Sequence, residues 1–472
     1  MAQFLPFDFP DEVIDRFRAK REIPVNFYNK DGQVLIYQKD QATSEEIEGL
    51  MRFVDQGIFY STDDTDKLGL GKRGRDVPDG LTDTKLLSEQ AAGTMTANTV
   101  EFFEKLKSDS LGSFETDKVG KTLDGVFTDF QDQPDAMVGL VNILSLMSGM
   151  DAPSDVEMAV KRTTVAMALK TRGMHAMNYR EKKKVRELVN IIMTSALLCD
   201  VGCNRMTMPT GDGLSEKEMQ SIQNHPFLSY LALAPMDDID TRIKRNVLCH
   251  HRPLRDNRKS NNYPTLKWLI RSLDMLAEVH QDLPGSPILG DIKRTRLLLI
   301  QELPYDEDAN ILSIASAFAS LTSRTAWRDA FPALRAVKMI VNQSFFGYSY
   351  RALREFLDYV AISLCDNQLI IKEQDILVLG TRSAEGKPYF EVVRVLKATR
   401  HQSCPLVMRL GVIAPTIEQT PRIAFTNFSP RTFREDKRRA RFDLGRDGSR
   451  QIVYVVDAFY DAELYEAMSK VG

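Results

Sequence analysis

Histidine, cysteine and aspartate side chains recur in three short stretches near the middle of this 472-residue chain. Their imidazole, carboxylate and thiol groups are the usual protein ligands of transition metals, so they could hold a water-activating divalent ion. They could also form a zinc site from thiols and imidazoles, although the spacings match no standard zinc module, and buried cysteines often act as small apolar side chains. The zinc site would use Cys199, Cys203, Cys249, His225 and His250.

The order of the stretches resembles that of the HD-GYP family of bacterial cyclic di-GMP phosphodiesterases. Cys199-Asp200-Val201-Gly202-Cys203 is similar to the family's His-Asp-x-Gly-Lys, and Asn262-Tyr263-Pro264 to its Gly-Tyr-Pro. Between them, His225-Pro226 and His250-His251 match its His-Pro and His-His. The resemblance implies an all-helical HD-type domain, with a vestigial metal site or a purely structural remnant at Asp200, His225, His250 and His251.

Five positions depart from the family's pattern in ways that oppose catalysis. Lys161 stands where the family has its first histidine, and an ammonium group is a cation that cannot accept a metal. Cys199 and Cys203 replace a histidine and a lysine. Ser316 and Ala319 stand where the family has two aspartates, three residues apart on one helical face. We therefore expect a catalytically inactive protein with no cofactor, or at most one divalent metal (Fe, Mn or Zn).

Basic and aromatic residues near the histidines could contact a nucleotide. Arg252 and Arg255 belong to the run RPLRDNRK, and guanidinium groups bind phosphate oxygens in pairs of hydrogen bonds. Tyr263 and Arg328 complete the predicted ligand-binding set for cyclic di-GMP or a related nucleotide. A solvated loop is the alternative for the basic run. Trp327 could stack on a guanine, but a helical aromatic residue more often fills the core, which is the favoured interpretation.

Helices must position these side chains. The segment KKVRELVNIIMTSALLCDVG has Val185, Leu188 and Ile192 at helical spacings, and Gly202 could end that helix. Ser215 with Glu218 forms a capping-box pattern that opens the helix leading to His225.

The segments around this region predict a multidomain, mainly α protein. Residues 1–65 read as a small α/β domain, with a hairpin at Asp31-Gly32 and a capping box at Thr43 and Glu46. Residues 66–130 read as a linker with connecting helices, residues 131–365 as the degenerate HD-GYP-like helical domain, and residues 366–472 as a β-rich module of alternating apolar segments.

Composition limits the function further. The formal net charge is −3 and the chain has five cysteines, so neither a basic nucleic-acid-binding surface nor a disulfide framework is expected. The N-terminus lacks a signal-peptide pattern and no apolar run reaches membrane-helix length, so we expect a cytoplasmic protein without membrane insertion. The expected function is a cyclic di-GMP receptor or an adaptor for a protein partner in bacterial signalling. A residual mononuclear phosphohydrolase and a scaffold without a small ligand are the alternatives.

Overall fold

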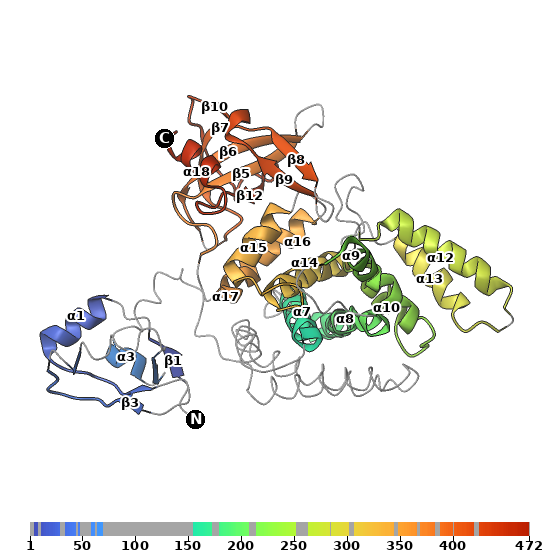
Figure 1. Ribbon diagram of the computed structural model, residues 1–472, viewed down its shortest axis with the longest axis horizontal. Helices are drawn as coiled ribbons and strands as arrows, with labels where there is room; N and C mark the ends of the chain where they lie inside the picture. Colours follow the sequence, from blue (N-terminus) through green and yellow to red (C-terminus); the bar gives the residue numbers. More distant parts are fainter. Residues whose placement is uncertain are drawn as a thin grey trace. The chain divides into compact units, whose positions relative to one another are not determined.

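The computed structural model describes two compact units, Met1–Thr82 and Asp83–Gly472 (Figure 1). In the first unit the described residues are 4–7, 11–28, 34–43, 46–47, 58–61 and 64–68. In the second they are 154–171, 179–206, 214–251, 263–283, 285–301, 306–343, 348–365, 369–382, 388–399, 401–419 and 424–471. The linker predicted from residue 66 and the start of the predicted helical domain therefore lie mainly outside the described residues.

The first unit is a small α/β fold. Its antiparallel sheet has the order β1-β4-β2-β3, and β2 pairs with β3, which confirms the predicted hairpin, although its turn lies outside the described residues. The predicted capping box is also present, because Glu46 accepts from the Thr43 amide at 2.8 Å and its own amide donates to Thr43 Oγ1. The elements are β1 (Phe4–Pro6), α1 (Asp11–Lys20), β2 (Phe27–Tyr28), β3 (Val34–Ile36), β4 (Phe59–Ser61) and α3 (Thr65–Leu68).

The described part of the second unit, from residue 154, opens with helices, as predicted. They are α7 (Ser154–Thr171), α8 (Tyr179–Leu198), the 3₁₀ turn η6 (Val201–Arg205), α9 (Glu216–Gln223), α10 (His225–Leu233), α11 (Thr241–Cys249), α12 (Leu266–Gln281), α13 (Leu289–Gln301), α14 (Glu307–Thr322), α15 (Ala333–Asn342), α16 (Tyr350–Glu355), the π-helical turn η10 (Phe356–Val360) and α17 (Ala361–Leu364). None of these described helices combines the length and apolar character of a membrane span.

Two of the helix boundaries matter for the site. Helix α8 follows the predicted apolar spacing but ends at Leu198, before Gly202, because the chain turns at once into η6. Helix α9 begins as predicted, since Ser215 and Glu218 form a reciprocal capping box. The helix that follows, α10, then starts with His225 itself.

A β-rich part completes the second unit. Its main sheet has the order β10-β7-β6-β5-β12, with β11 also paired to β7, and β8 pairs with β9. The strands confirm the predicted alternation after residue 366. They are β5 (Ile376–Arg382), β6 (Pro388–Lys397), β7 (Leu406–Val412), β8 (Pro415–Gln419), β9 (Ala424–Phe428), β10 (Arg434–Glu435), β11 (Arg441–Asp443) and β12 (Gln451–Val455), with η11 (Pro430–Thr432) and the final helix α18 (Ala462–Ser469).

Both faces of the main sheet are buried, and one face shares the core of the helices. Leu377 and Leu379 of β5 belong to the large core that also contains Ile340 of α15. Ile376 and Val378, which alternate with them, belong to a second core under α18. Successive side chains of a strand point to opposite faces, so the continuous apolar sequence of β5 supplies both cores.

A buried polar network ties together the helices that carry the histidines. Lys244 of α11 donates to Asp291 of α13 at 3.0 Å, and both side chains are only 1% exposed. Tyr230 of α10 donates to the other oxygen of Asp291 at 3.1 Å. Because α10 begins at His225 and α11 ends beside His250, this network fixes the two helices relative to each other.

Removing one partner of this network should destabilise the fold strongly. Lys244→Ala leaves the buried Asp291 carboxylate with only the exposed Arg294, 3.9 Å away, as a cation. We therefore expect the free energy of unfolding to fall by about 3–5 kcal/mol. The double replacement Lys244→Met with Asp291→Leu should cost less, because no charge is then left unpaired. Urea unfolding measures both, with Lys217→Ala on exposed α9 as the control. Equal losses in the single and double variants would contradict the interpretation.

Candidate functional site

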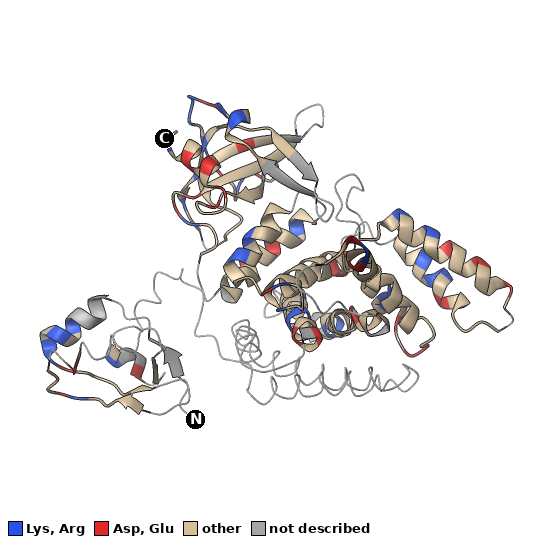
Figure 2. Cartoon of the chain, in the orientation of Figure 1, with Lys and Arg blue, Asp and Glu red and all other residues tan. Residues whose placement is uncertain are grey.

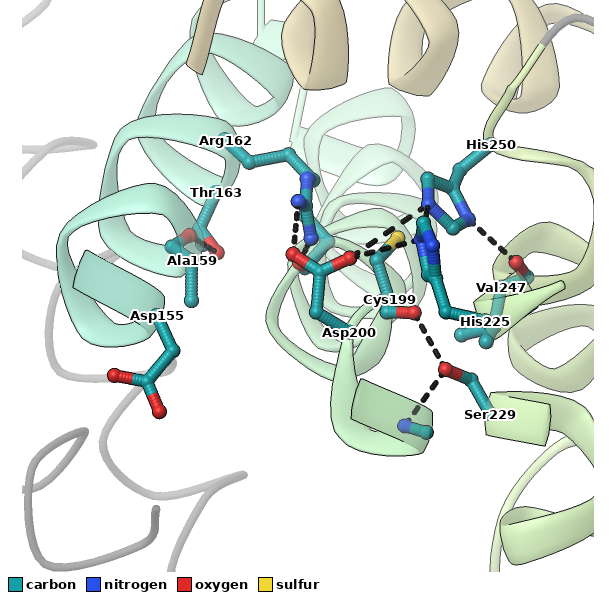
Figure 3. Close-up of polar contacts among 12 residues, drawn as sticks. Asp155, Ala159, Arg162, Thr163, Cys199, Asp200, His225, Ser229, Val247 and His250 are labelled. Atoms are coloured by element: carbon teal, nitrogen blue, oxygen red, sulfur yellow. Dashed lines mark hydrogen bonds and ion pairs between the residues drawn. The ribbon is translucent and has the colours of Figure 1, made fainter. Parts of the chain in front are cut away.

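The candidate site begins at the turn between α8 and η6, which is clamped onto the start of α10. Ser229 donates to the carbonyl of Cys199 at 2.7 Å and accepts from the amide of Gly202 at 2.8 Å (Figure 3). A side chain at Gly202 would place its Cβ 2.4 Å from the Ser229 nitrogen, so only glycine permits this approach. The clamp puts the Asp200 carboxylate beside His225, with 3.1 Å between Oδ1 and Nε2.

Two histidines face each other across this turn with their orientation set by the backbone. His225 Nδ1 lies 2.7 Å from the Ile222 carbonyl, and His250 Nδ1 lies 2.6 Å from the Val247 carbonyl. A carbonyl only accepts, so each Nδ1 carries a proton and each Nε2 of a neutral ring presents a lone pair. The two Nε2 atoms are 3.0 Å apart, close to the roughly 3.3 Å that two ligands of one tetrahedral zinc would show. Either a proton or a cation is needed between them.

A cation already contacts the carboxylate. Arg162 of α7 donates to Asp200 Oδ2 through one nitrogen and to the Ala196 carbonyl at 3.2 Å through another (Figure 3). Burial by itself would raise the pKa of Asp200, but the Arg162 charge holds it far below its ordinary value. Burial, His225 and Arg162 hold the pKa of His250 well below its ordinary value. The carboxylate is therefore ionised and His250 neutral at pH 7.

The residues implied as metal ligands do converge. Within the described part of the chain, two sets have ligand atoms within 4.8 Å of one another: His225, His250 and His251, and Asp200, Cys203 and His225. This donor set fits one ion. Cys203 enters only as a thiol, since burial, then the Asp200 charge, raises its pKa.

The other two cysteines of the zinc alternative lie outside these sets. Cys199 donates its thiol to the Ser195 carbonyl at 3.1 Å, and burial raises its pKa to about 12. Burial likewise raises the pKa of Cys249 to about 12. A zinc site using all of the predicted thiols is therefore not what the geometry supports.

Lys161, which was expected to oppose a metal, forms its hydrogen bonds away from the Asp200 carboxylate. Its ammonium group donates to Glu157 and, at 2.6 Å, to the Thr322 carbonyl at the end of α14. Arg162, which the sequence pattern did not single out, supplies the cation at Asp200 instead. The available signal was a second basic residue directly after Lys161.

Ser316 and Ala319, the positions compared above with two aspartates, are buried in α14. Ser316 is 1% exposed and Ala319 is fully buried. Ser316 Oγ has no hydrogen-bond partner among the described residues. Neither side chain offers a charged ligand, so this helix adds no carboxylate to the site.

Of the predicted nucleotide contacts, Tyr263 joins the cluster. Its ring stacks on His251 with centroids 3.9 Å apart and meets His225 edge-on at 6.1 Å. Arg328 donates to the Ser320 carbonyl. Burial lowers the Arg328 pKa, and the nearby Tyr263 acts in the opposite direction. Arg252 and Arg255 lie outside the described residues.

Comparisons with known proteins give little beyond this geometry. No family model and no curated protein matches the chain. A solved structure, Bd1817, described as an HDG"Y"P protein from Bdellovibrio bacteriovorus, aligns with 77% of this chain and 99% of its own, at 12% identity and a TM-score of 0.33. A score this low leaves the chemistry of the site to be judged from its own contacts.

The pKa shifts predict how stability depends on pH. Asp200 binds its proton less readily in the folded chain, so its contribution is complete above the unfolded pKa of about 3.9 and is lost as pH falls below it. His250 stays neutral when folded, so its contribution is lost below its unfolded pKa of about 6.5. Urea unfolding from pH 8 to pH 3 should show stability falling over both windows. Asp200→Asn should flatten the lower window, and an unchanged slope there would contradict the assignment.

Proposed function

We propose that this chain is a catalytically inactive HD-GYP-like signalling protein, which binds cyclic di-GMP or a related nucleotide or acts as an adaptor for a protein partner. The observation that carries the proposal is the buried ion pair between Arg162 and Asp200. It supplies, from the protein itself, the positive charge that a metal would bring to this carboxylate.

The ion pair opposes two-metal hydrolysis in a specific way. A binuclear centre needs carboxylate oxygens to hold two cations about 3.5–4 Å apart. Here one oxygen of Asp200 is taken by a guanidinium group, and Ser316 and Ala319 offer no carboxylate from α14. With too few anionic ligands, a second ion would add charge that nothing nearby neutralises.

The aromatic cluster supports ligand binding without turnover. Tyr263 stacked on His251 forms a flat platform at the edge of the site, and aromatic side chains bind nucleobases by stacking. The guanidinium of Arg328 lies near Tyr263 and supplies a positive charge beside this platform. Stacking and phosphate contacts need no metal, so binding survives the loss of chemistry.

A residual mononuclear phosphohydrolase is the second candidate. The two converging Nε2 atoms favour it, because a histidine that ligates a metal commonly donates its other ring N–H to a carbonyl. His225, His250 and Asp200, with His251 or Cys203, would hold the ion, and its chemistry would be activation of a water molecule. Arg162 sets the two candidates apart, since it lowers the affinity of this donor set for any cation.

Removing the cation should therefore strengthen metal binding. Arg162→Met frees one oxygen of Asp200, and we expect zinc or manganese to bind at least about tenfold more tightly, equivalent to about 1.4 kcal/mol. Lys161→Met is the matched control, because the adjacent ammonium group bonds elsewhere and its loss should leave metal affinity unchanged. Calorimetric titration and elemental analysis measure both. Two ions per chain in the unmodified protein would overturn the proposal.

The unmodified protein should show no cyclic di-GMP hydrolysis, with or without added manganese or iron. It should bind the nucleotide in a calorimetric titration, and Tyr263→Ala should weaken binding by roughly tenfold, within the range of one stacking contact. Tyr359→Ala is the control, since this tyrosine is 50% exposed and lies against His401. Turnover by the unmodified protein would favour the mononuclear hydrolase, whereas absent binding would leave only the adaptor role.

A further inference from the structure

Helix α12 exposes a row of large apolar side chains. The row consists of Trp268, Met275 and Val279 in the helix and Leu283 just after its last residue. Their exposed fractions are 42%, 58%, 63% and 51%, respectively. Their spacings of seven, four and four residues place them along one side of the helix. Soluble proteins seldom line up exposed apolar side chains without a partner.

The fold of this unit does not need this row. A different side of α12 carries its buried residues, Leu269 and Leu273, which pack with residues of α10, α11 and α13. Asp274 pairs with Arg296 of α13, which fixes the hairpin of α12 and α13. Of the row itself, Trp268 contacts Phe227 edge-on at 5.4 Å and is otherwise exposed.

Charges beside the row are divided between the two ends of the helix. Lys267 and Arg271 lie near its start, and Glu278 and Asp282 near or just after its end (Figure 2). All four are exposed. Within the described part of the chain, no ion pair engages any of them.

We propose that α12 is a self-complementary interface that pairs antiparallel with α12 of a second copy of this chain. A twofold axis near Met275 places each basic half against the acidic half of the other copy. Lys267 then faces Asp282 of the second copy and Arg271 faces Glu278, while the apolar rows meet between them. A twofold interface uses the same patch twice, and this division of charge fits a copy of itself without a further protein. The proposal does not depend on the metal or nucleotide chemistry.

The interface should be weak, because it rests on few side chains. We expect a monomer–dimer equilibrium for the full chain, detectable by sedimentation velocity between about 1 and 100 µM, the behaviour of a small transient interface. Met275→Glu with Val279→Glu should raise the dimer dissociation constant at least about tenfold. Leu297→Glu is the control, since Leu297 on α13 is 50% exposed but lies outside the row.

A charge exchange gives a second test that leaves the apolar row intact. Arg271→Glu alone and Glu278→Arg alone should each weaken the dimer, because every dimer contains two such pairs. The double variant restores both pairs with reversed polarity and should return the dissociation constant to within about threefold of the original. Circular dichroism verifies that each variant is folded. A protein that stays monomeric throughout, or a double variant without rescue, would overturn the proposal.

Discussion

The need to neutralise one buried carboxylate organises the centre of the helical part. Asp200 is 7% exposed, and an unpaired charge at that depth would destabilise the fold by several kcal/mol. Arg162 reaches it from α7, His225 from α10, and Ser229 holds the turn in place through the backbone of its neighbours. The contacts that neutralise the Asp200 charge also limit what the site can bind, because a carboxylate oxygen that contacts Arg162 or His225 is less available to coordinate a metal.

The histidines are oriented as metal ligands would be, although a guanidinium group already contacts the carboxylate beside them. Backbone carbonyls fix the protonated nitrogen of His225 and of His250, so both remaining nitrogens converge whether or not an ion is bound. This orientation depends on helix ends, which are built into the backbone. The charge balance depends on single side chains, so one substitution alters the charge of the site more readily than the orientation of its histidines.

The elements of the second unit differ in how completely their apolar faces are buried. The main sheet buries both faces, one against the helices and one under α18, which makes the β-rich part continuous with the helical core. Lys244 and Asp291 fix α11 and α13 from inside the same unit. Helix α12 is different. One of its sides packs against the core, whereas another exposes the apolar row, with basic residues near one end and acidic residues near the other.

The sequence alone determined the elements and the order of the ligands. Apolar periodicity predicted α8 and the strands after residue 366. The resemblance to the HD-GYP family grouped Asp200, His225, His250 and Tyr263, and their side chains lie together in the structure. Only the tertiary structure decided that Arg162, and not Lys161, contacts Asp200. The two residues are adjacent on α7, and their side chains point about 100° apart. Which one reaches Asp200 therefore depends on the packing of α7, and Lys161 instead donates to the Thr322 carbonyl of α14. Packing also decides the positions of the thiols. The sequence pattern does not reveal that Cys199 donates to a carbonyl of its own helix, whereas Cys203 lies beside Asp200 and His225.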